Sequence, residues 1–206
     1  MDLKYAGVLL CAGITTFSPL NRHILQTGGG QGKHVGIVGF GGLGQMGVKL
    51  AKAMGAKVTV FSRSDSKKNE AAKLGADLLV HTDEKAVQAA TRKFDVVLDT
   101  VSAPHSIANL INTLKVGSTY CMVGGVPKPF EISAFQMIFS RQSIEGCFIG
   151  GIPETQEMLD FCAKHNIAPE YEVISAAEAD DHFKALMGGT AGAKRCVIDT
   201  ATLEKL

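Results

Sequence analysis

Short apolar runs alternate with amphipathic segments along most of this 206-residue chain. Residues 34–38 and 94–100 are apolar and β-branched at consecutive positions, which is typical of strands buried on both faces of a parallel sheet. Apolar side chains recur at helical spacing between residues 43 and 54. The whole pattern predicts strands at 34–38, 57–61, 77–80, 94–100, 118–124 and 142–149, and helices at 43–54, 66–74, 84–90, 105–114 and from Ser133, where residues 133–136 have capping-box spacing.

This alternation predicts an α/β fold: a doubly wound parallel sheet of the Rossmann type with right-handed crossovers. The last part of the chain differs, because a helix at 153–164 is followed by a strand, a helix and a strand ending at Asp199 that need not join the same sheet. We therefore expect a Rossmann domain over residues 1–151 and a separate C-terminal segment over residues 152–206.

The apolar stretch at residues 5–17 is expected to be a buried helix. It is too short to cross a membrane. Only Lys4 precedes it where a signal peptide would carry a basic region.

Glycines at residues 39–44 lie between the first predicted strand and the following helix. A lone G-x-G-x-x-G is a weak signal, but a strand, a glycine turn, a helix and a second strand together indicate dinucleotide binding rather than a purely structural turn. Gly39 permits the tight turn, Gly41 lets the backbone approach a pyrophosphate, and Gly44 lets helix and strand pack closely. The helix N-terminus then offers N–H groups to the phosphates.

The end of the second strand indicates which dinucleotide is bound. NAD sites carry an Asp or Glu there for the ribose 2′-hydroxyl, whereas this chain has Ser62, Arg63 and Ser64, with Lys67 just beyond. Hydroxyl and cationic groups suit a 2′-phosphate through charge-assisted hydrogen bonds. The sequence favours NADP(H) over NAD(H), and ordinary solvated surface is the alternative for Arg63 and Lys67. Asp65 is expected to cap or begin the next helix.

Charge and cysteine content exclude several classes of binding partner and indicate the cellular compartment. A formal net charge of +1 argues against nucleic acid and against an anionic membrane surface. Five cysteines without a Cys-x-x-Cys pair predict free thiols in a reducing compartment, hence a cytoplasmic protein. Cys162 and His165 lie three residues apart on a predicted helix, a spacing that also arises by coincidence.

Together these features resemble the zinc-dependent medium-chain alcohol dehydrogenases, and the cinnamyl alcohol dehydrogenase branch most of all. The similarity covers nearly the whole chain. The matching motifs are residues 9–15 (LLCAGIT), 18–20 (SPL), 36–44 (GIVGFGGLG), 50–55 (LAKAMG), 99–105 (DTVSAPH), 149–151 (IGG), 154–162 (ETQEMLDFC) and 197–199 (VID).

The resemblance implies NADP(H)-dependent interconversion of small aldehydes and primary alcohols. It makes Cys11 one of three catalytic zinc ligands and Thr15 a contact of the nicotinamide region. The glycine turn would hold the pyrophosphate and the 62–67 segment the 2′-phosphate, with the backbone near Gly124 and Phe148 orienting the carboxamide. The full set of cofactor-binding residues that it implies is Thr15, Gly39, Gly41, Gly42, Leu43, Gly44, Ser62, Arg63, Ser64, Lys67, Thr100, Val101, Gly124, Gly125, Phe148 and Ile149.

The chain also departs from the family pattern. Full-length members begin with a GroES-like catalytic domain, and this sequence matches only the half of the family that comes after that domain. A catalytic zinc needs three protein ligands, of which only Cys11 is identifiable, so zinc is expected only if that domain is supplied. The alternative for Cys11 is a buried free thiol.

Two functions therefore remain open: the cofactor half of a working oxidoreductase, or a catalytically inactive NADP(H)-binding or dimerisation module. A homodimer through the strand at residues 143–149 is expected from the resemblance. Strands at 172–174 and 195–198 should leave apolar surface and strand edges exposed.

Overall fold

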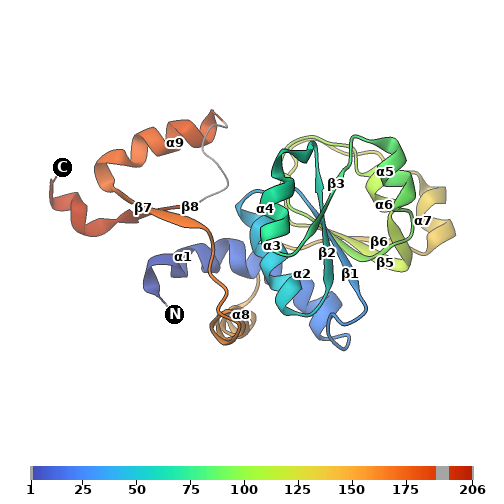
Figure 1. Cartoon of the computed structure of the whole chain (residues 1–206), viewed down its shortest axis with the longest axis horizontal. Helices are drawn as coiled ribbons and strands as arrows, with labels where there is room; N and C mark the ends of the chain where they lie inside the picture. Colours follow the sequence, from blue (N-terminus) through green and yellow to red (C-terminus); the bar gives the residue numbers. More distant parts are fainter. Residues whose placement is uncertain (1, 189–194, 206) are drawn as a thin grey trace.

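The computed structural model describes residues 2–188 and 195–205 and contains two separate sheets (Figure 1). Six parallel strands form the larger sheet in the order β3-β2-β1-β4-β5-β6, and β7 and β8 form the smaller one. The strands are β1 (His34–Val38), β2 (Lys57–Ser62), β3 (Asp77–Val80), β4 (Phe94–Asp99), β5 (Leu114–Met122), β6 (Ser143–Gly146), β7 (Tyr171–Ser175) and β8 (Arg195–Asp199). The helices are α1 (Ala6–Val8), α2 (Ile14–Leu20), α3 (Gly42–Ala53), α4 (Lys68–Lys73), α5 (Glu84–Ala89), α6 (Ala108–Ile111), α7 (Ala134–Ser140), α8 (Ile152–Lys164) and α9 (Ala179–Met187).

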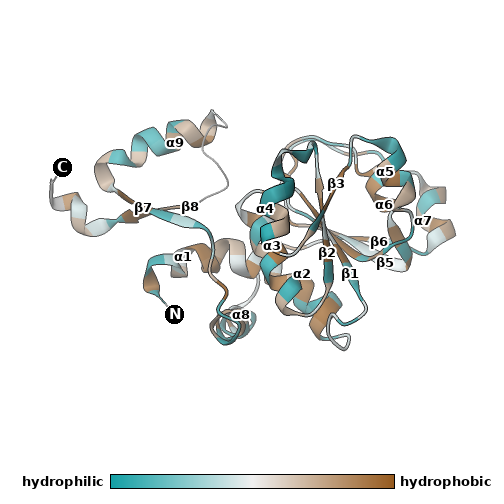
Figure 2. Ribbon diagram, viewed as in Figure 1, coloured by the Kyte–Doolittle hydropathy of each residue, from teal (hydrophilic) through white to brown (hydrophobic). Residues whose placement is uncertain are grey.

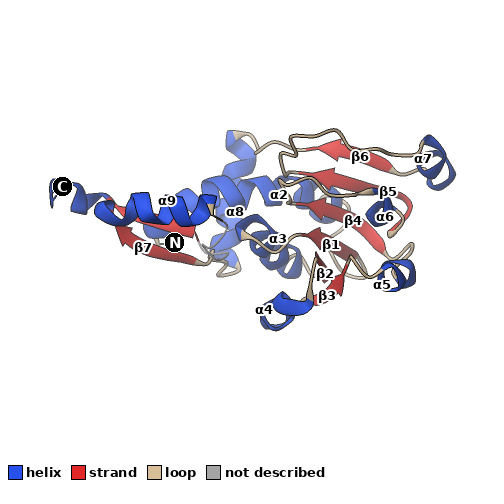
Figure 3. Ribbon diagram, turned by 90° about the horizontal axis from the view of Figure 1, so that it is seen from above, coloured by secondary structure: helices blue, strands red, loops and turns tan. Residues whose placement is uncertain are grey.

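Strand residues alternate between two cores, one on each face of the larger sheet. Ile37, Val60 and Leu98 belong to one buried cluster, whereas their neighbours Phe61 and Val97 belong to the other. Alternation of this kind follows from the pleat, and two apolar faces require helices on both sides. Figure 3 shows helices flanking both faces of the sheet. The predicted doubly wound Rossmann architecture is confirmed.

The order of the strands places a switch point between β1 and β4. β1 pairs with β2 on one side and with β4 on the other, with Val38 opposite Phe61 and opposite Asp99. The chain moves outward from β1 in one direction and later in the other, which leaves a crevice beyond the carboxyl ends of the strands. Residues that follow β1 and β4 therefore meet at one edge.

A continuous helical segment, Leu3–Leu25, precedes the sheet. The prediction of a helix too short to span a membrane was wrong, because the helix runs past residue 17 and is long and apolar enough to cross one. More than half of its most apolar window is buried in the fold. The Phe17 ring lies 5.6 Å from that of Phe161 on α8. The methyl group of Thr16, on α2, lies near Gly47 on α3. Such packing is typical of a core helix.

The C-terminal part contains two differently placed units. Met158 and Cys162 of α8 are buried in the same cluster as residues of α2, α3 and β1. The β7–β8 sheet with α9 instead projects to one side of the main sheet, and its surface carries apolar residues (Figures 1 and 2). Val173, Phe183 and Ile198 are about half exposed or more, as expected. The domain boundary at 151/152 stays a prediction.

Several predicted elements have other bounds in the structure, and the strand predicted at 118–124 begins four residues earlier, as β5 (Leu114–Met122). The helix at 105–114 shrinks to α6, and Leu114 already begins β5. The strand at 142–149 is only Ser143–Gly146, since Ile149 takes a left-handed φ of 58° that a strand does not accommodate. The helix after Ser133 forms, but the Ser133 side chain makes no capping hydrogen bond.

Candidate functional site

The glycine turn joins β1 directly to α3 at the switch point. Gly39 has φ +87°, and its N–H donates to the Phe61 carbonyl at 3.0 Å. A Cβ on Gly44 would lie 2.2 Å from the Gly39 carbonyl oxygen, whereas one on Gly41 would meet no atom within 4 Å. Gly44 is therefore required by the protein's own packing, and Gly41 faces space that a ligand could enter.

The turn delivers the N-terminus of a twelve-residue helix. Gly41 is the N-cap of α3, and its carbonyl accepts the Gln45 N–H at 2.9 Å. Because a glycine N-cap has no side-chain acceptor, it makes no side-chain bond to the first-turn N–H groups of Gly42, Leu43 and Gly44. N–H groups at the positive end of a helix dipole suit a phosphate.

Arg195 adds a cation at this helix end, and the sequence patterns did not single it out. It is the first residue of β8, and its Nε lies 2.6 Å from where a Cβ of Gly42 would be. A guanidinium and a helix N-terminus together form a strongly anion-attracting corner. The sequence position of a basic residue does not show which distant element its side chain reaches, so only the placement of the Arg195 side chain beside Gly42 reveals it.

The segment after β2 holds the residues predicted for the 2′-phosphate. The Ser64 N–H donates to the Ser62 hydroxyl at 3.4 Å, and the Thr82 hydroxyl donates to the Arg63 carbonyl at 3.2 Å. These bonds fix the backbone while the Arg63 and Ser64 residues stay exposed. Lys67 instead pairs with Glu70 at 3.1 Å, so its charge is partly compensated. Asp65 lies in the first turn of the next helical stretch, as predicted.

Thr100 and Val101 follow β4 and lie against the glycine turn. The Thr100 hydroxyl donates to the Val38 carbonyl at 2.8 Å. A Cβ on Gly39 would meet the Val101 side chain at 2.9 Å, and one on Gly124 would lie 2.2 Å from the Val101 carbonyl oxygen. The ends of β1, β4 and β5 thus form one continuous wall.

Asp99, the last residue of β4, holds the residues of this wall through hydrogen bonds. Its carboxylate is buried and accepts from His105 Nε2 at 2.9 Å, Tyr120 Oη at 2.9 Å and the Val101 N–H at 3.0 Å. Burial raises the pKa of Tyr120 well above its usual value, and the neighbouring Asp99 charge adds to the effect. The tyrosine is therefore a neutral donor, which the Asp99 carboxylate requires.

The other predicted cofactor residues lie farther along the fold. Phe148 and Ile149 follow β6, the third strand from β1 on that side, and Phe148 is 92% exposed. Gly125 follows Gly124 beyond β5. Thr15 is nearly buried on α2, the helix that packs against α3.

Cys11 is exposed, so the expectation of a buried thiol was wrong. It lies in a wide helical turn and lines a cavity of about 290 Å³ together with Arg195 and Cys196. Within the described residues, Cys11 belongs to no group of three potential metal ligands. A three-ligand catalytic zinc site does not fit this part of the chain. Cys162 is buried against Met158 and His165 stacks on Phe161, so that pair forms no metal site either.

Comparison with known proteins identifies relatives over the whole fold. The family model described as zinc-binding dehydrogenase matches residues 42–164. The chain is 53% identical to vomilenine reductase of Rauvolfia serpentina over 84% of its own length and 48% of the relative. It is 47% identical to an aldehyde reductase of Escherichia coli over 98% of its length and 57% of the relative. The chain thus spans about half the length of the curated relatives it matches.

Solved structures agree with this assignment. A cinnamyl alcohol dehydrogenase of Sorghum bicolor superposes with a TM-score of 0.90 at 37% identity, over 98% of this chain and 56% of that one. A cinnamyl alcohol dehydrogenase of Helicobacter pylori, solved with NADP(H), gives 0.80 at 38% identity over 94% and 54%. The larger sheet aligns with the C-terminal half of such structures.

Proposed function

Because this chain belongs to the zinc-binding dehydrogenase family, we propose that it binds NADP(H) as the cofactor half of an oxidoreductase. The reaction proposed is hydride transfer between small aldehydes and primary alcohols, in the cytoplasm. The relatives include an aldehyde reductase and a cinnamyl alcohol dehydrogenase bound to NADP(H). The observation that carries the proposal is the open turn at Gly41, beside the Arg195 guanidinium.

The pyrophosphate is assigned to the N-terminus of α3. First-turn N–H groups of Gly42, Leu43 and Gly44 face the negative charge, and Arg195 neutralises it from β8. Gly39 shapes the turn, and Gly41 keeps its inner side free of a side chain. The contacts around the turn support each of these proposed roles.

The 2′-phosphate is assigned to Ser62, Arg63 and Ser64. Arg63 is exposed and lies two residues after Phe61, whose carbonyl accepts the Gly39 N–H, and no acidic residue ends β2 to repel a phosphate. Lys67 contributes only after leaving Glu70, so Arg63 should carry most of the preference for NADP(H) over NAD(H).

The nicotinamide half is assigned to the wall beyond β4, β5 and β6. Thr100 and Val101 position the ribose side, and the backbones of Gly124, Gly125, Phe148 and Ile149 orient the carboxamide. Thr15 approaches from α2. When bound, the nicotinamide supplies or accepts the hydride. The described residues lack a three-ligand zinc set around Cys11.

The second candidate function is a catalytically inactive NADP(H)-binding or dimerisation module, and the isolated position of Cys11 favours it. Aldehyde-dependent oxidation of NADPH separates the two. Turnover by the purified chain, lost in Cys11→Ser, supports the enzyme, whereas tight NADPH binding without turnover supports the module.

Calorimetric titration with NADPH and NADH tests the cofactor assignment. Arg63→Asp is expected to weaken NADPH binding by about 10- to 100-fold, because a charge-assisted bond becomes a repulsion. NADH binding should change far less. Lys73→Asp, at the other end of α4, makes the same charge change as a control and should leave NADPH affinity unchanged. Equal losses for NADPH and NADH would remove Arg63 from the site.

We also propose that the chain forms a homodimer through β6, the last strand of the larger sheet. Among the residues that the structure describes, β6 pairs with β5 alone, so its outer edge presents unpaired backbone groups. Phe148, just beyond this strand, is 92% exposed. A two-fold pairing of β6 edges would cover both.

A further inference from the structure

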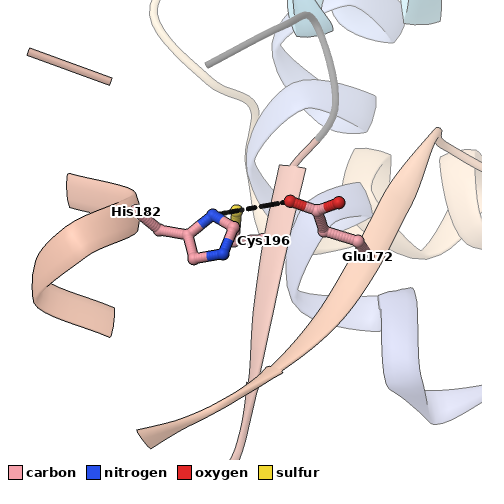
Figure 4. Close-up of side chains that lie close together, drawn as sticks. All are labelled: Glu172, His182 and Cys196. Atoms are coloured by element: carbon pink, nitrogen blue, oxygen red, sulfur yellow. Dashed lines mark hydrogen bonds and ion pairs between the residues drawn. The ribbon is translucent and has the colours of Figure 1, made fainter. Parts of the chain in front are cut away.

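Three potential metal ligands meet on the smaller sheet, and one of them, Cys196, directly follows Arg195, the cation assigned to the pyrophosphate. β7 and β8 run parallel with Glu172 opposite Cys196. Directly paired residues of neighbouring strands project to the same face. Figure 4 shows the His182 imidazole, carried by α9, pointing toward the Glu172 and Cys196 side chains. Topology thus brings one nitrogen, one oxygen and one sulfur ligand together.

The separations among these atoms suit a tetrahedral ion. His182 Nδ1 lies 3.4 Å from Glu172 Oε1 and 3.3 Å from Cys196 Sγ. Cys196 Sγ lies 3.6 Å from Glu172 Oε1. Zinc bonds of about 2.0–2.1 Å to N or O and about 2.3 Å to S, at tetrahedral angles, require separations of about 3.4 Å and about 3.6 Å. The triangle is therefore already close to the size that zinc needs.

We propose that Glu172, His182 and Cys196 bind a divalent ion of the zinc class. A thiolate, an imidazole and a carboxylate are a donor set that favours Zn²⁺ over Mg²⁺ or Ca²⁺, which prefer oxygen alone. Two negative ligands balance the charge of the ion. Each of the three residues is half-buried, so metal and water can both reach the site.

Binding releases the Cys196 thiol proton to solvent. A lone pair of the thiolate sulfur then coordinates the ion without any change of oxidation state. His182 coordinates as neutral imidazole through Nδ1. With three protein ligands, a fourth position remains for water or another small ligand. The bound ion would cross-link α9 to both strands. Such a cross-link would stabilise the smaller sheet, because two strands alone are only marginally stable.

A network of hydrogen bonds is the competing explanation, since Cys196 Sγ already donates to Glu172. Such a network stabilises the same contacts without any metal. Co²⁺ distinguishes the two, because a cobalt–thiolate bond produces a charge-transfer absorption that a hydrogen bond cannot.

The experiment is a Co²⁺ titration of the purified chain, with Zn²⁺ as competitor. We expect one equivalent of Co²⁺ to bind with a thiolate charge-transfer band that Zn²⁺ abolishes. Cys196→Ser should lose the band, and Glu172→Gln, which keeps the shape of the side chain, should weaken binding by about tenfold or more. Cys11→Ser is the matched control, because Cys11 lines the same cavity as Cys196; it should keep the cobalt band of the parent chain.

Loss of the band in Cys11→Ser, or an unchanged band in Cys196→Ser, would overturn the proposal, as would the absence of any band in the parent chain. Far-UV circular dichroism of each variant checks that the fold survives. None of these readouts involves NADPH, so the metal site and the cofactor assignment stand or fall separately.

Discussion

Single side chains determine how the carboxyl edge of the larger sheet is built. Asp99 is 1% exposed and accepts three hydrogen bonds, from His105, Tyr120 and Val101. A buried carboxylate is tolerated only when it is satisfied in this way. The loop after β4 is therefore held by a buried, fully hydrogen-bonded side chain.

The bonds around Asp99 also explain why the helix predicted at 105–114 begins late. His105 donates to Asp99 through Nε2, and its Nδ1 lies 2.9 Å from the Ala103 carbonyl. These tertiary contacts keep His105 in the loop and delay the helix to Ala108. Helical periodicity cannot reveal a bond between a loop residue and a buried carboxylate.

His34 makes stability depend on pH. Burial lowers the pKa of His34 from 6.5 to about 4, and Lys57 adds to the effect. Between these values the unfolded state binds the proton and the folded state does not. The contribution of His34 to the free energy of unfolding is therefore fully present above pH 6.5 and is lost as the pH falls toward 4.

We expect the free energy of unfolding to fall by about 1–2 kcal/mol from this group, less than the full shift because solvent reaches the ring. Urea denaturation at both ends of the range measures it. His34→Gln, which can still bond to Thr59, should reduce the difference between the two pH values. An unchanged difference would assign the pH dependence to other groups.

At the scale of elements, two glycines of the β1-turn-α3 unit have different roles: Gly44 is needed for packing, whereas Gly41 is proposed to leave room for the ligand. A Cβ on Gly44 would lie 2.2 Å from the Gly39 carbonyl oxygen, but one on Gly41 would meet nothing within 4 Å. Gly41 has an ordinary φ of −83°, so alanine fits its backbone.

Gly44→Ala is expected to lower the free energy of unfolding by about 2 kcal/mol or more through overpacking. Gly41→Ala should change it by less than about 0.5 kcal/mol, yet weaken NADPH binding by about tenfold or more by filling the space for the pyrophosphate. Thermal unfolding and calorimetry measure the two effects. Full NADPH affinity in Gly41→Ala would contradict the assigned pyrophosphate position.

Local sequence predicted the regular elements far better than the contacts between them. The strands through residue 122 and the glycine turn emerged from apolar runs and glycine spacing, because both signals are local. Arg195 and the Glu172–His182–Cys196 group did not, since each depends on how β8 packs against other elements. The prediction that Cys11 is buried was wrong because helical periodicity does not show which side of the helix other elements cover.

At the scale of the whole molecule, the exposed edge of β6 predicts self-association. We expect light scattering to give the mass of a dimer for the parent chain and of a monomer for Ile144→Asp. Ile144 also packs against the core, so Phe148→Asp serves as a second variant that leaves the core intact. A dimer that persists in Phe148→Asp, together with a folded and dimeric Ile144→Asp, would place the interface elsewhere.

Gly42 and Arg195 belong to different parts of the fold, one after the larger sheet's β1 and one on the smaller sheet, yet their contact closes one corner of the molecule. A nucleotide held by both resists any motion that separates the sheets, and its contribution grows with the logarithm of its concentration above the dissociation constant. The cofactor concentration would then determine how stable the contact between the two sheets is, in addition to the fraction of sites that are filled.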